Sequence, residues 1–347
     1  MKHLSRTHAQ AEAVIDALSD IPWPSTDAGA PAALLSRCPV AAPTPLVQSA
    51  ELARMAGVAE VTIKDERPRM GLGSFKALGA AYVIACDAAA GSAEGQTYVT
   101  ASAGNHGLSV AAGAQAFGAT SVIYLAETVP ETFADRLRGF GADVRRHGAV
   151  YEDSMAEAAR VAEAQGWALL SDSSWPGYTA IPHRLMEGYT VLMQEVVDAM
   201  PAPTHIFLQA GVGGLAAACA AVARAAWGDD PRIAVVEPHV APAIFASVEA
   251  GGPQVTAGPS SDMGRLDCKE PSLIALKGLA RDATDFVLIT EAEGAHGSSV
   301  AATVGLPSTP SGAAGLAALL ASADQRRTLG LGDTSRVLLI LSEDASE

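Results

Sequence analysis

Short apolar runs alternate with longer alanine-rich stretches along most of this chain. The runs are rich in Val, Ile and Leu, and the stretches between them have the length and spacing of helices. The expected strands are Val61–Lys64, Tyr98–Ala101, Ser121–Ala126, Asp143–Arg146, Ala168–Ser171, His205–Ala210, Ile233–Glu237, Phe286–Thr290 and Val337–Ser342. Nearly continuous apolar strands are typical of sheets covered on both faces, and their alternation with helices favours parallel connections. The pattern therefore predicts an α/β fold with mostly parallel sheets.

The chain is too long, and its expected strands too numerous, for one ordinary sheet. It has 347 residues, so two sheets in two domains are expected. The first fifty residues differ from the rest because six prolines break them into an extended arm after one helix near residues 9–18. Residues 251–264 form a long loop without periodicity, a kind of segment that often contacts substrate in compact enzymes.

Composition and charge exclude several classes of protein. A net charge of −15 argues against nucleic acid or an anionic membrane as a partner. The four cysteines have no zinc-site spacing, so no metal is expected and the thiols are expected to be reduced. Residues 1–13 lack the apolar core of a signal peptide, and no apolar run is long enough to span a membrane. These features predict a cytoplasmic protein.

Lys76 stands at the start of an apolar helical pattern, directly after a glycine-rich run. Gly71 and Gly73 allow a tight approach to the helix, and Phe75 and Leu78 make its surroundings apolar. A helix N-terminus disfavours a cation, so we expect a lowered lysine pKa at this position. Such an amine suits a Schiff base with a carbonyl cofactor. Alone, Lys76 would more simply be a surface lysine, but its neighbours favour a partly buried site.

Two turns of small residues join an expected strand to an expected helix. Residues 100–107 read Thr-Ala-Ser-Ala-Gly-Asn-His-Gly, and residues 209–216 read Gln-Ala-Gly-Val-Gly-Gly-Leu-Ala. Each would present successive N–H groups at a helix N-terminus, where an anion binds. The first could instead be an ordinary turn capped by Asn105. With Lys76, the two turns predict pyridoxal phosphate (PLP) as the cofactor.

The second turn has a rival interpretation. It matches the pattern G-x-G-x-x-A, and Glu237 ends the next expected strand, as in a dinucleotide-binding fingerprint. An NAD(P)-dependent oxidoreductase is therefore the remote alternative. A dehydrogenase needs neither Lys76 nor the serine- and glycine-containing turn, and this favours PLP.

Taken in order, these segments resemble the PLP enzymes of the tryptophan synthase β/threonine dehydratase fold, known as fold type II. Within that group the chain is most similar to the diaminopropionate ammonia-lyases, and the resemblance covers roughly residues 41–342. The segments that carry it are Pro43–Leu46, Val61–Glu66, Gly71–Leu72, Ser74–Lys76, Asn105–Gly107, Ser171–Tyr178, Ile181–Pro182, Phe207–Gly213, Cys268–Ser272 and Ser311–Leu316.

The resemblance implies an architecture and a role for each site residue. It implies a large PLP-binding domain over residues 1–75 and 187–347 and a small domain over 76–186, each an open, mostly parallel twisted sheet flanked by helices. Lys76 would bond to the cofactor and shuttle protons, and Asp172 would act near the substrate amine. Asn105 would contact the phenolic oxygen and Ser342 the pyridine nitrogen. The remaining contacts implied are Gly211, Val212, Gly213, Gly214 and Leu215 to the phosphate, and Ser102, Ala103, Gly104 and His106 to the substrate.

The implied activity is α,β-elimination of ammonia or water from a small β-substituted L-amino acid such as 2,3-diaminopropionate, giving a 2-oxo acid and ammonia. A homodimer is also implied. The alternative within the same fold is a serine/threonine-type dehydratase or racemase. One departure bears on stereochemistry, because Ala103 stands where the ammonia-lyases carry an aspartate that serves as a second base. We therefore expect the L-isomer to react and the D-isomer not to react.

Overall fold

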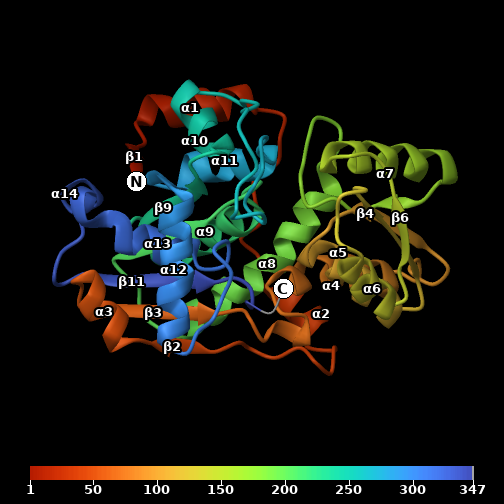
Figure 1. Cartoon of the computed structure of the whole chain (residues 1–347), viewed down its shortest axis with the longest axis horizontal. Helices are drawn as coiled ribbons and strands as arrows, with labels where there is room; N and C mark the ends of the chain where they lie inside the picture. The colour runs from red at the N-terminus through yellow and green to blue at the C-terminus, as the bar shows by residue number, and fades with distance from the viewer. Residues whose placement is uncertain (346–347) are drawn as a thin grey trace.

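The computed structural model describes residues 1–345 and contains two sheets, each with helices packed against it (Figure 1). The larger sheet has the strand order β1-β10-β9-β8-β11-β3-β2. Its strands are β1 (Lys2–Ser5), β2 (Leu46–Gln48), β3 (Glu60–Asp65), β8 (His205–Gln209), β9 (Arg232–Pro238), β10 (Asp285–Ile289) and β11 (Arg336–Leu341). The inner strands are parallel, and the edge strands β1 and β2 pair antiparallel with their neighbours.

Helices cover both faces of the larger sheet, which explains why its strands read as nearly continuous apolar runs. On β11, Leu338 and Ile340 join one core cluster, while Val337, Leu339 and Leu341 join the other. The first cluster includes residues of α1 (His8–Ala17), α2 (Gly29–Leu35), α8 (Ala180–Ala199), α9 (Gly214–Trp227), α10 (Ala243–Ala250) and α11 (Leu273–Asp282). The second includes residues of α3 (Ala50–Ala56), α12 (Glu291–Thr303), α13 (Ala314–Leu320) and α14 (Arg326–Leu329).

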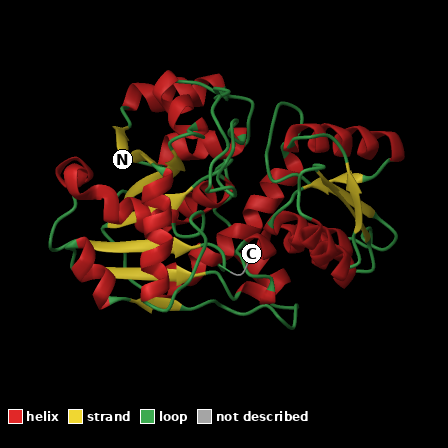
Figure 2. Ribbon diagram, viewed as in Figure 1, coloured by secondary structure: helices red, strands yellow, loops and turns green. Residues whose placement is uncertain are grey.

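The smaller sheet is entirely parallel and has the order β6-β5-β4-β7. It stands apart from the larger sheet in Figure 2. Its strands are β4 (Thr97–Ala101), β5 (Thr120–Leu125), β6 (Asp143–Arg146) and β7 (Ala168–Leu169), and its helices are α4 (Lys76–Ala89), α5 (Asn105–Ala116), α6 (Glu131–Gly139) and α7 (Tyr151–Gln165). The α/β fold with mostly parallel sheets is thereby confirmed.

The N-terminal arm holds more regular structure than the sequence predicted. Beyond the expected helix, it contributes β1 and β2 as edge strands of the larger sheet, and α2 and α3 pack on the core. Both strands are short and antiparallel, so they lack the continuous apolar run of an inner strand. The expected long loop is confirmed, since residues 251–272 contain neither helix nor strand.

Helix α8 links the two sheets by packing against α4 on one side and α9 on the other. Glycines let α4 and α8 approach closely. A Cβ on Gly79 would lie 2.6 Å from the Tyr189 ring, and a Cβ on Gly188 would lie 2.5 Å from the carbonyl oxygen of Leu78. The short 3₁₀ helices η1 (Arg69–Gly71) and η2 (Ala321–Gln325) complete the described elements. This packing brings the starts of α4 and α9 to the same side chain, because the Lys76 amine lies 5.8 Å from the Tyr189 ring centroid and a Cβ on Gly214 would lie 3.6 Å from the Tyr189 ring.

Candidate functional site

Lys76 is the first residue of α4, and its amine donates a hydrogen bond to the carboxylate of Asp172. Gly71 and Gly73 hold positive φ angles of 70° and 81° just before the helix, a conformation that favours glycine. The ammonium also lies 5.2 Å from the Phe75 ring centroid and 5.8 Å from that of Tyr189. Both side chains of the ion pair are about four-fifths buried. The partly buried amine expected from the sequence is therefore present.

The expected direction of the Lys76 pKa shift is wrong. Burial lowers the pKa of the Lys76 amine, but the Asp172 carboxylate outweighs this and holds that pKa above its ordinary value. For Asp172 the two effects have the opposite signs. Burial raises the pKa of its carboxyl, but Lys76 and His106 lower it by more, so that pKa lies below its usual range. The sequence could not place Asp172, which is far along the chain, beside the amine.

The turn that precedes α5 brings together several predicted residues. Gly104 is the N-cap of α5, and its N–H donates to Ser102 Oγ at 3.1 Å. Asn105 is buried, and its amide nitrogen donates to Glu343 Oε2 at 2.6 Å. The side chain of Ala103 is partly buried and packs against the first core cluster. The first N–H groups of a helix have no intrahelical acceptor, so this turn can bind an anion.

His106 is held by the backbone of the neighbouring strand region. Its Nε2 lies 2.8 Å from the carbonyl oxygen of Leu170, so this nitrogen carries the proton. Burial lowers the pKa of the ring, which keeps it neutral. Its other ring nitrogen, Nδ1, is buried without a partner among residues 1–345.

The glycine-rich turn after β8 leads directly into α9. Gly213 is the N-cap of α9 and has a φ of 99°. A Cβ at this position would lie 2.7 Å from Ile244 Cδ1. At Gly211, a Cβ would lie 3.0 Å from both the carbonyl oxygen of Arg265 and the sulfur of Cys268. Only glycine adopts the Gly213 conformation without strain. It leaves the N–H groups of Gly214 and Leu215, at the start of α9, without intrahelical acceptors.

Ser342 directly follows the central strand β11, and its backbone contacts Phe75, the residue before Lys76. Its carbonyl oxygen accepts the Phe75 N–H at 3.1 Å, and its own N–H donates to Gly312 at 3.3 Å. The Ser342 side chain is buried. The structure thus brings Ser342 close to the start of α4.

Four site residues were given no role in the sequence analysis, although Cys268 begins a segment that carries the resemblance: Tyr189, Arg265, Cys268 and Glu343. Glu343 is 3% exposed and accepts hydrogen bonds from Asn105 and Thr309. Burial raises the pKa of the Cys268 thiol to about 12, with Asp172 adding to the effect. No local pattern marks these residues, because each reaches the site through long-range packing. The weak signals were the acidic residue after the last strand and the long loop before Cys268.

Several buried polar atoms around these residues lack a partner among residues 1–345. They are Asn105 Oδ1, His106 Nδ1, the Tyr189 hydroxyl and Gln209 Oε1. Buried polar groups are normally satisfied, so atoms of this kind indicate a bound ligand. A paired lysine, two helix N-termini and these atoms fit PLP, which has an aldehyde, a phosphate, a phenolic oxygen and a ring nitrogen.

The rival dinucleotide interpretation is not supported by the position of Glu237. Its carboxylate accepts the N–H groups of Ile244 at 2.8 Å and Phe245 at 2.7 Å, at the start of α10. The side chain is 1% exposed. Glu237 therefore satisfies a helix terminus and is not available to a ribose hydroxyl.

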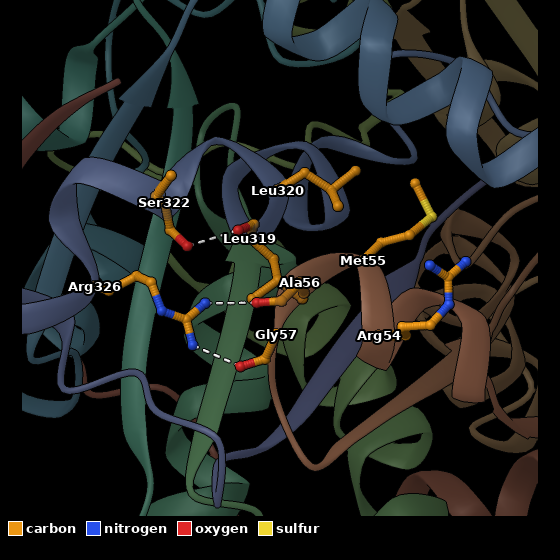
Figure 3. A pocket seen from close by; sticks show the side chains of 9 residues that line it. Arg54, Met55, Ala56, Gly57, Leu319, Leu320, Ser322 and Arg326 are labelled. Carbon is orange, nitrogen blue, oxygen red and sulfur yellow. Dashed lines mark hydrogen bonds between the residues drawn. The ribbon is translucent and has the colours of Figure 1, made fainter.

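A separate surface hollow lies between α3 and the segment around η2 (Figure 3). Its volume is about 260 Å³. Arg326 donates to the carbonyl oxygens of Ala56 at 2.5 Å and Gly57 at 2.7 Å, which satisfies the end of α3. The lining contains no carboxylate, thiol or imidazole side chain that could act as an acid, base or nucleophile. The role of Arg326 in this hollow is to cap α3.

Residues 1–345 contain neither a candidate membrane span nor a candidate metal site. No helix there is both long enough and apolar enough to cross a bilayer. No group of three or more His, Cys, Asp or Glu side chains there could hold a metal ion.

Comparison with known proteins agrees with this geometry. Residues 38–343 match the protein family described as "Pyridoxal-phosphate dependent enzyme". A diaminopropionate ammonia-lyase of Salmonella typhimurium is 32% identical over 295 residues, which are 77% of this chain and 73% of that protein. A threonine dehydratase of Pasteurella multocida is 32% identical over 216 residues, or 62% of this chain and 39% of that protein.

Solved structures are similar over the whole length. The crystal structure of the diaminopropionate ammonia-lyase from Escherichia coli in complex with D-serine superimposes with a TM-score of 0.88. The match covers 100% of this chain and 94% of that chain, at 27% sequence identity.

Proposed function

The chain belongs to the family of pyridoxal-phosphate dependent enzymes, and on that premise we propose that it is an ammonia-lyase acting on 2,3-diaminopropionate or a closely similar β-substituted L-amino acid. The products would be a 2-oxo acid and ammonia. The observation that carries the proposal is the largely buried Lys76–Asp172 pair, which contacts the same elements as two helix N-termini: Ser109 of α5 donates to the Lys76 carbonyl oxygen at 2.7 Å, and the Tyr189 ring lies near both the Lys76 amine and Gly214. It combines an amine that can carry a proton, a carboxylate that holds that amine and two anion-binding turns in one site.

When bound, PLP withdraws electrons from the substrate α-carbon, which eases loss of the α-proton and of the β-substituent. Lys76 would take the proton from that carbon, because its amine is the basic group at the start of α4. Elimination of ammonia also needs a proton on the leaving nitrogen. The Asp172 carboxylate lies against Lys76 and would hold the protonated amine near that nitrogen, so that Lys76 delivers the proton it has taken.

The remaining predicted residues would hold the cofactor and the substrate. The turn Gly211–Leu215 would bind the phosphate through the N–H groups at the start of α9. Asn105 would contact the phenolic oxygen, and the Ser342 hydroxyl would face the ring nitrogen. Ser102, Ala103, Gly104 and His106 line the turn at the start of α5, where a substrate carboxylate would bind. Closure of these groups around the ligand would exclude water from the reacting carbon.

The test is a substrate panel with the purified holoenzyme. Both isomers of 2,3-diaminopropionate, serine, threonine and 3-hydroxyaspartate are assayed for ammonia and 2-oxo acid. An absorption band at ~410–430 nm should accompany activity. Release of ammonia fastest from L-2,3-diaminopropionate supports the proposal. Comparable or faster turnover of serine or threonine would contradict it.

A serine/threonine-type dehydratase is the second candidate, and one observation favours it. Ala103 offers no carboxylate in the turn before α5, so the site lacks one acid that a reaction on a diamine could use. The same panel separates the two, because the leaving group is an amine in one and a hydroxyl in the other.

Three further features belong to the proposal. We propose a homodimer in the cytoplasm, and a division into a large domain (1–75 and 187–347) and a small domain (76–186). The two separate sheets support the division. Light scattering during size-exclusion chromatography tests the oligomeric state, and limited proteolysis between the sheets tests the boundaries.

A further inference from the structure

Tyr189 lies in the middle of α8, and the hydroxyl end of its ring faces the helices α4 and α9. The ring atom Cε1 is 2.6 Å from the position that a Cβ on Gly79 would take, and Cε2 is 3.6 Å from the corresponding position on Gly214. These two carbons flank the carbon that carries the hydroxyl. The hydroxyl end of the ring therefore lies between the first turn of α4 and the first residue of α9.

Packing fixes the Tyr189 ring in this place. The side chain is 1% exposed, and its ring meets the Phe75 ring edge-on, with centroids 4.9 Å apart and planes at 63°. The Lys76 amine lies 5.8 Å from the Tyr189 centroid. A side chain at Gly79 would push the ring out of its position. Because aromatic rings in a close-packed interior do not shift freely, the direction of the hydroxyl is set by the fold.

The Tyr189 hydroxyl is a buried donor that lacks an acceptor among residues 1–345. Burial raises the pKa of this hydroxyl well above its ordinary value, and the nearby Lys76 lowers it by less. The O–H group therefore keeps its proton at neutral pH and can only be satisfied as a donor by an acceptor atom. Buried polar groups are normally paired, so a bound molecule is expected to bring that acceptor.

The start of α9 indicates which acceptor this is. The N–H groups of Gly214 and Leu215 have no intrahelical acceptors, and Gly213, with a φ of 99°, leads the backbone into them. A helix start of this kind binds an anion, and a phosphate has enough oxygens to accept several donors at once. The protonated Lys76 amine is itself a donor and pairs with Asp172, so it supplies no acceptor.

We infer that the Tyr189 hydroxyl donates a hydrogen bond to the phosphate of PLP, so that the helix linking the two sheets contributes a side chain to the cofactor site. The inference rests on the cofactor of the family and goes beyond the proposed substrate, so the substrate panel and the test below can fail separately. The turn Gly211–Leu215 offers backbone donors to the same phosphate. Tyr189 would add a side-chain donor from another element, and a hydrogen bond to a charged acceptor is stronger than one to a neutral acceptor.

The experiment compares two ligands that differ by the phosphate. Pyridoxal has the ring and the aldehyde of PLP but no phosphate, and the visible absorption of the apoprotein with each compound gives a Kd. Tyr189→Phe keeps the ring and removes the hydroxyl. The Kd of PLP should rise roughly 10-fold or more, as expected for loss of a hydrogen bond to a charged group, while the Kd of pyridoxal stays within about twofold. Because the hydroxyl has no partner among residues 1–345, the free energy of unfolding of the apoprotein should not fall.

Tyr82→Phe is the matched control. Tyr82 is also buried between α4 and α8, but its hydroxyl donates to Glu187 Oε2 at 2.9 Å. Its removal should lower the free energy of unfolding and leave both Kd values unchanged. An unchanged PLP Kd in Tyr189→Phe would overturn the inference. Equal weakening of PLP and pyridoxal would also overturn it, because the hydroxyl would then act on Lys76 or the ring. The same loss of PLP affinity in Tyr82→Phe would assign the effect to the packing of α4 on α8 and overturn it as well.

Discussion

The helices α4 and α9 begin in the same site but contribute to it by opposite means. At the start of α4 the functional group is a side chain, Lys76, and its position depends on a partner, Asp172. At the start of α9 the backbone itself is functional, and Gly213 holds a φ of 99° against a packed apolar neighbour. The comparison separates chemistry from binding, since α4 supplies a reactive group and α9 supplies only N–H donors.

The largest effect should come from the reactive side chain. Lys76→Ala removes the amine, so it should abolish turnover and the borohydride-reducible bond between protein and cofactor. Lys269→Ala serves as the control, since that lysine supports the loop 251–272. Absorption spectra and ammonia release measure both. A visible band and near-normal activity in Lys76→Ala would show that another lysine does this work.

The turn before α5 combines the two kinds of contribution seen at α4 and α9, because it offers both N–H groups and side chains. With Ala103 in this turn, one face of the bound substrate lacks the expected base. We expect kcat/KM for D-2,3-diaminopropionate to be at least ~100-fold below that of the L-isomer, the usual contribution of a general base. Assays with each pure enantiomer measure the ratio.

Comparable rates for the two isomers would mean that another group serves the second face. Glu343 is then the residue to test, because its buried carboxylate contacts Asn105. Loss of D-isomer activity alone in Glu343→Gln would identify it as that base.

The backbone-only helix start is tested by adding a side chain. Gly213→Val should weaken PLP binding by ~100-fold, because it displaces several N–H donors from a charged phosphate. The strained φ should lower the free energy of unfolding of the apoprotein by only about 1–3 kcal/mol. Equilibrium dialysis and urea unfolding measure the two quantities.

Gly228→Val is the control at the other end of the same helix. Gly228 also has a positive φ, of 60°, but a Cβ there would meet no atom within 4 Å. It should strain the backbone and leave PLP affinity unchanged. Unaltered retention of PLP in Gly213→Val would remove α9 from the cofactor site.

The smallest effect should come from the partner of the lysine. Asp172→Asn should lower kcat at least ~10-fold, because it removes the carboxylate that holds the protonated Lys76 amine near the leaving group, while Lys76 itself remains. A wild-type rate across the pH range would remove Asp172 from the mechanism.

The same pair gives the apoprotein a predictable dependence on pH. The pKa of Asp172 is lowered on folding, so its stabilising contribution is present above the ordinary carboxyl pKa and is lost as the pH falls. The pKa of Lys76 is raised, so its contribution is present below the ordinary amine pKa and is lost as the pH rises. Urea unfolding at several pH values should show both losses in the wild type and a flatter profile in Asp172→Asn.

The sequence predicted what depends on local pattern. Inner strands such as β11 were visible as apolar runs, and Lys76, Asn105 and Gly213 were visible because small-residue turns precede their helices. The edge strands β1 and β2 were missed, since three or four residues with one covered face carry no continuous apolar signal. Arg265 and Glu343 were missed for another reason: each acquires its role only when distant segments meet. The sign of the Lys76 pKa shift was wrong because it depends on Asp172, which is 96 positions away.

The hydrogen bond from Phe75 to Ser342 has a consequence for how the protein is made. β11 is a central strand of the larger sheet, between β8 and β3, yet it follows all the other described strands in chain order. During translation, β3 and β8 lack the strand that lies between them, and the carbonyl that anchors Phe75 does not yet exist. Pairings between such distant segments form slowly. Lys76 is therefore fixed in place only after β11 has docked between β3 and β8, and we expect capture of the cofactor to be a late step of folding.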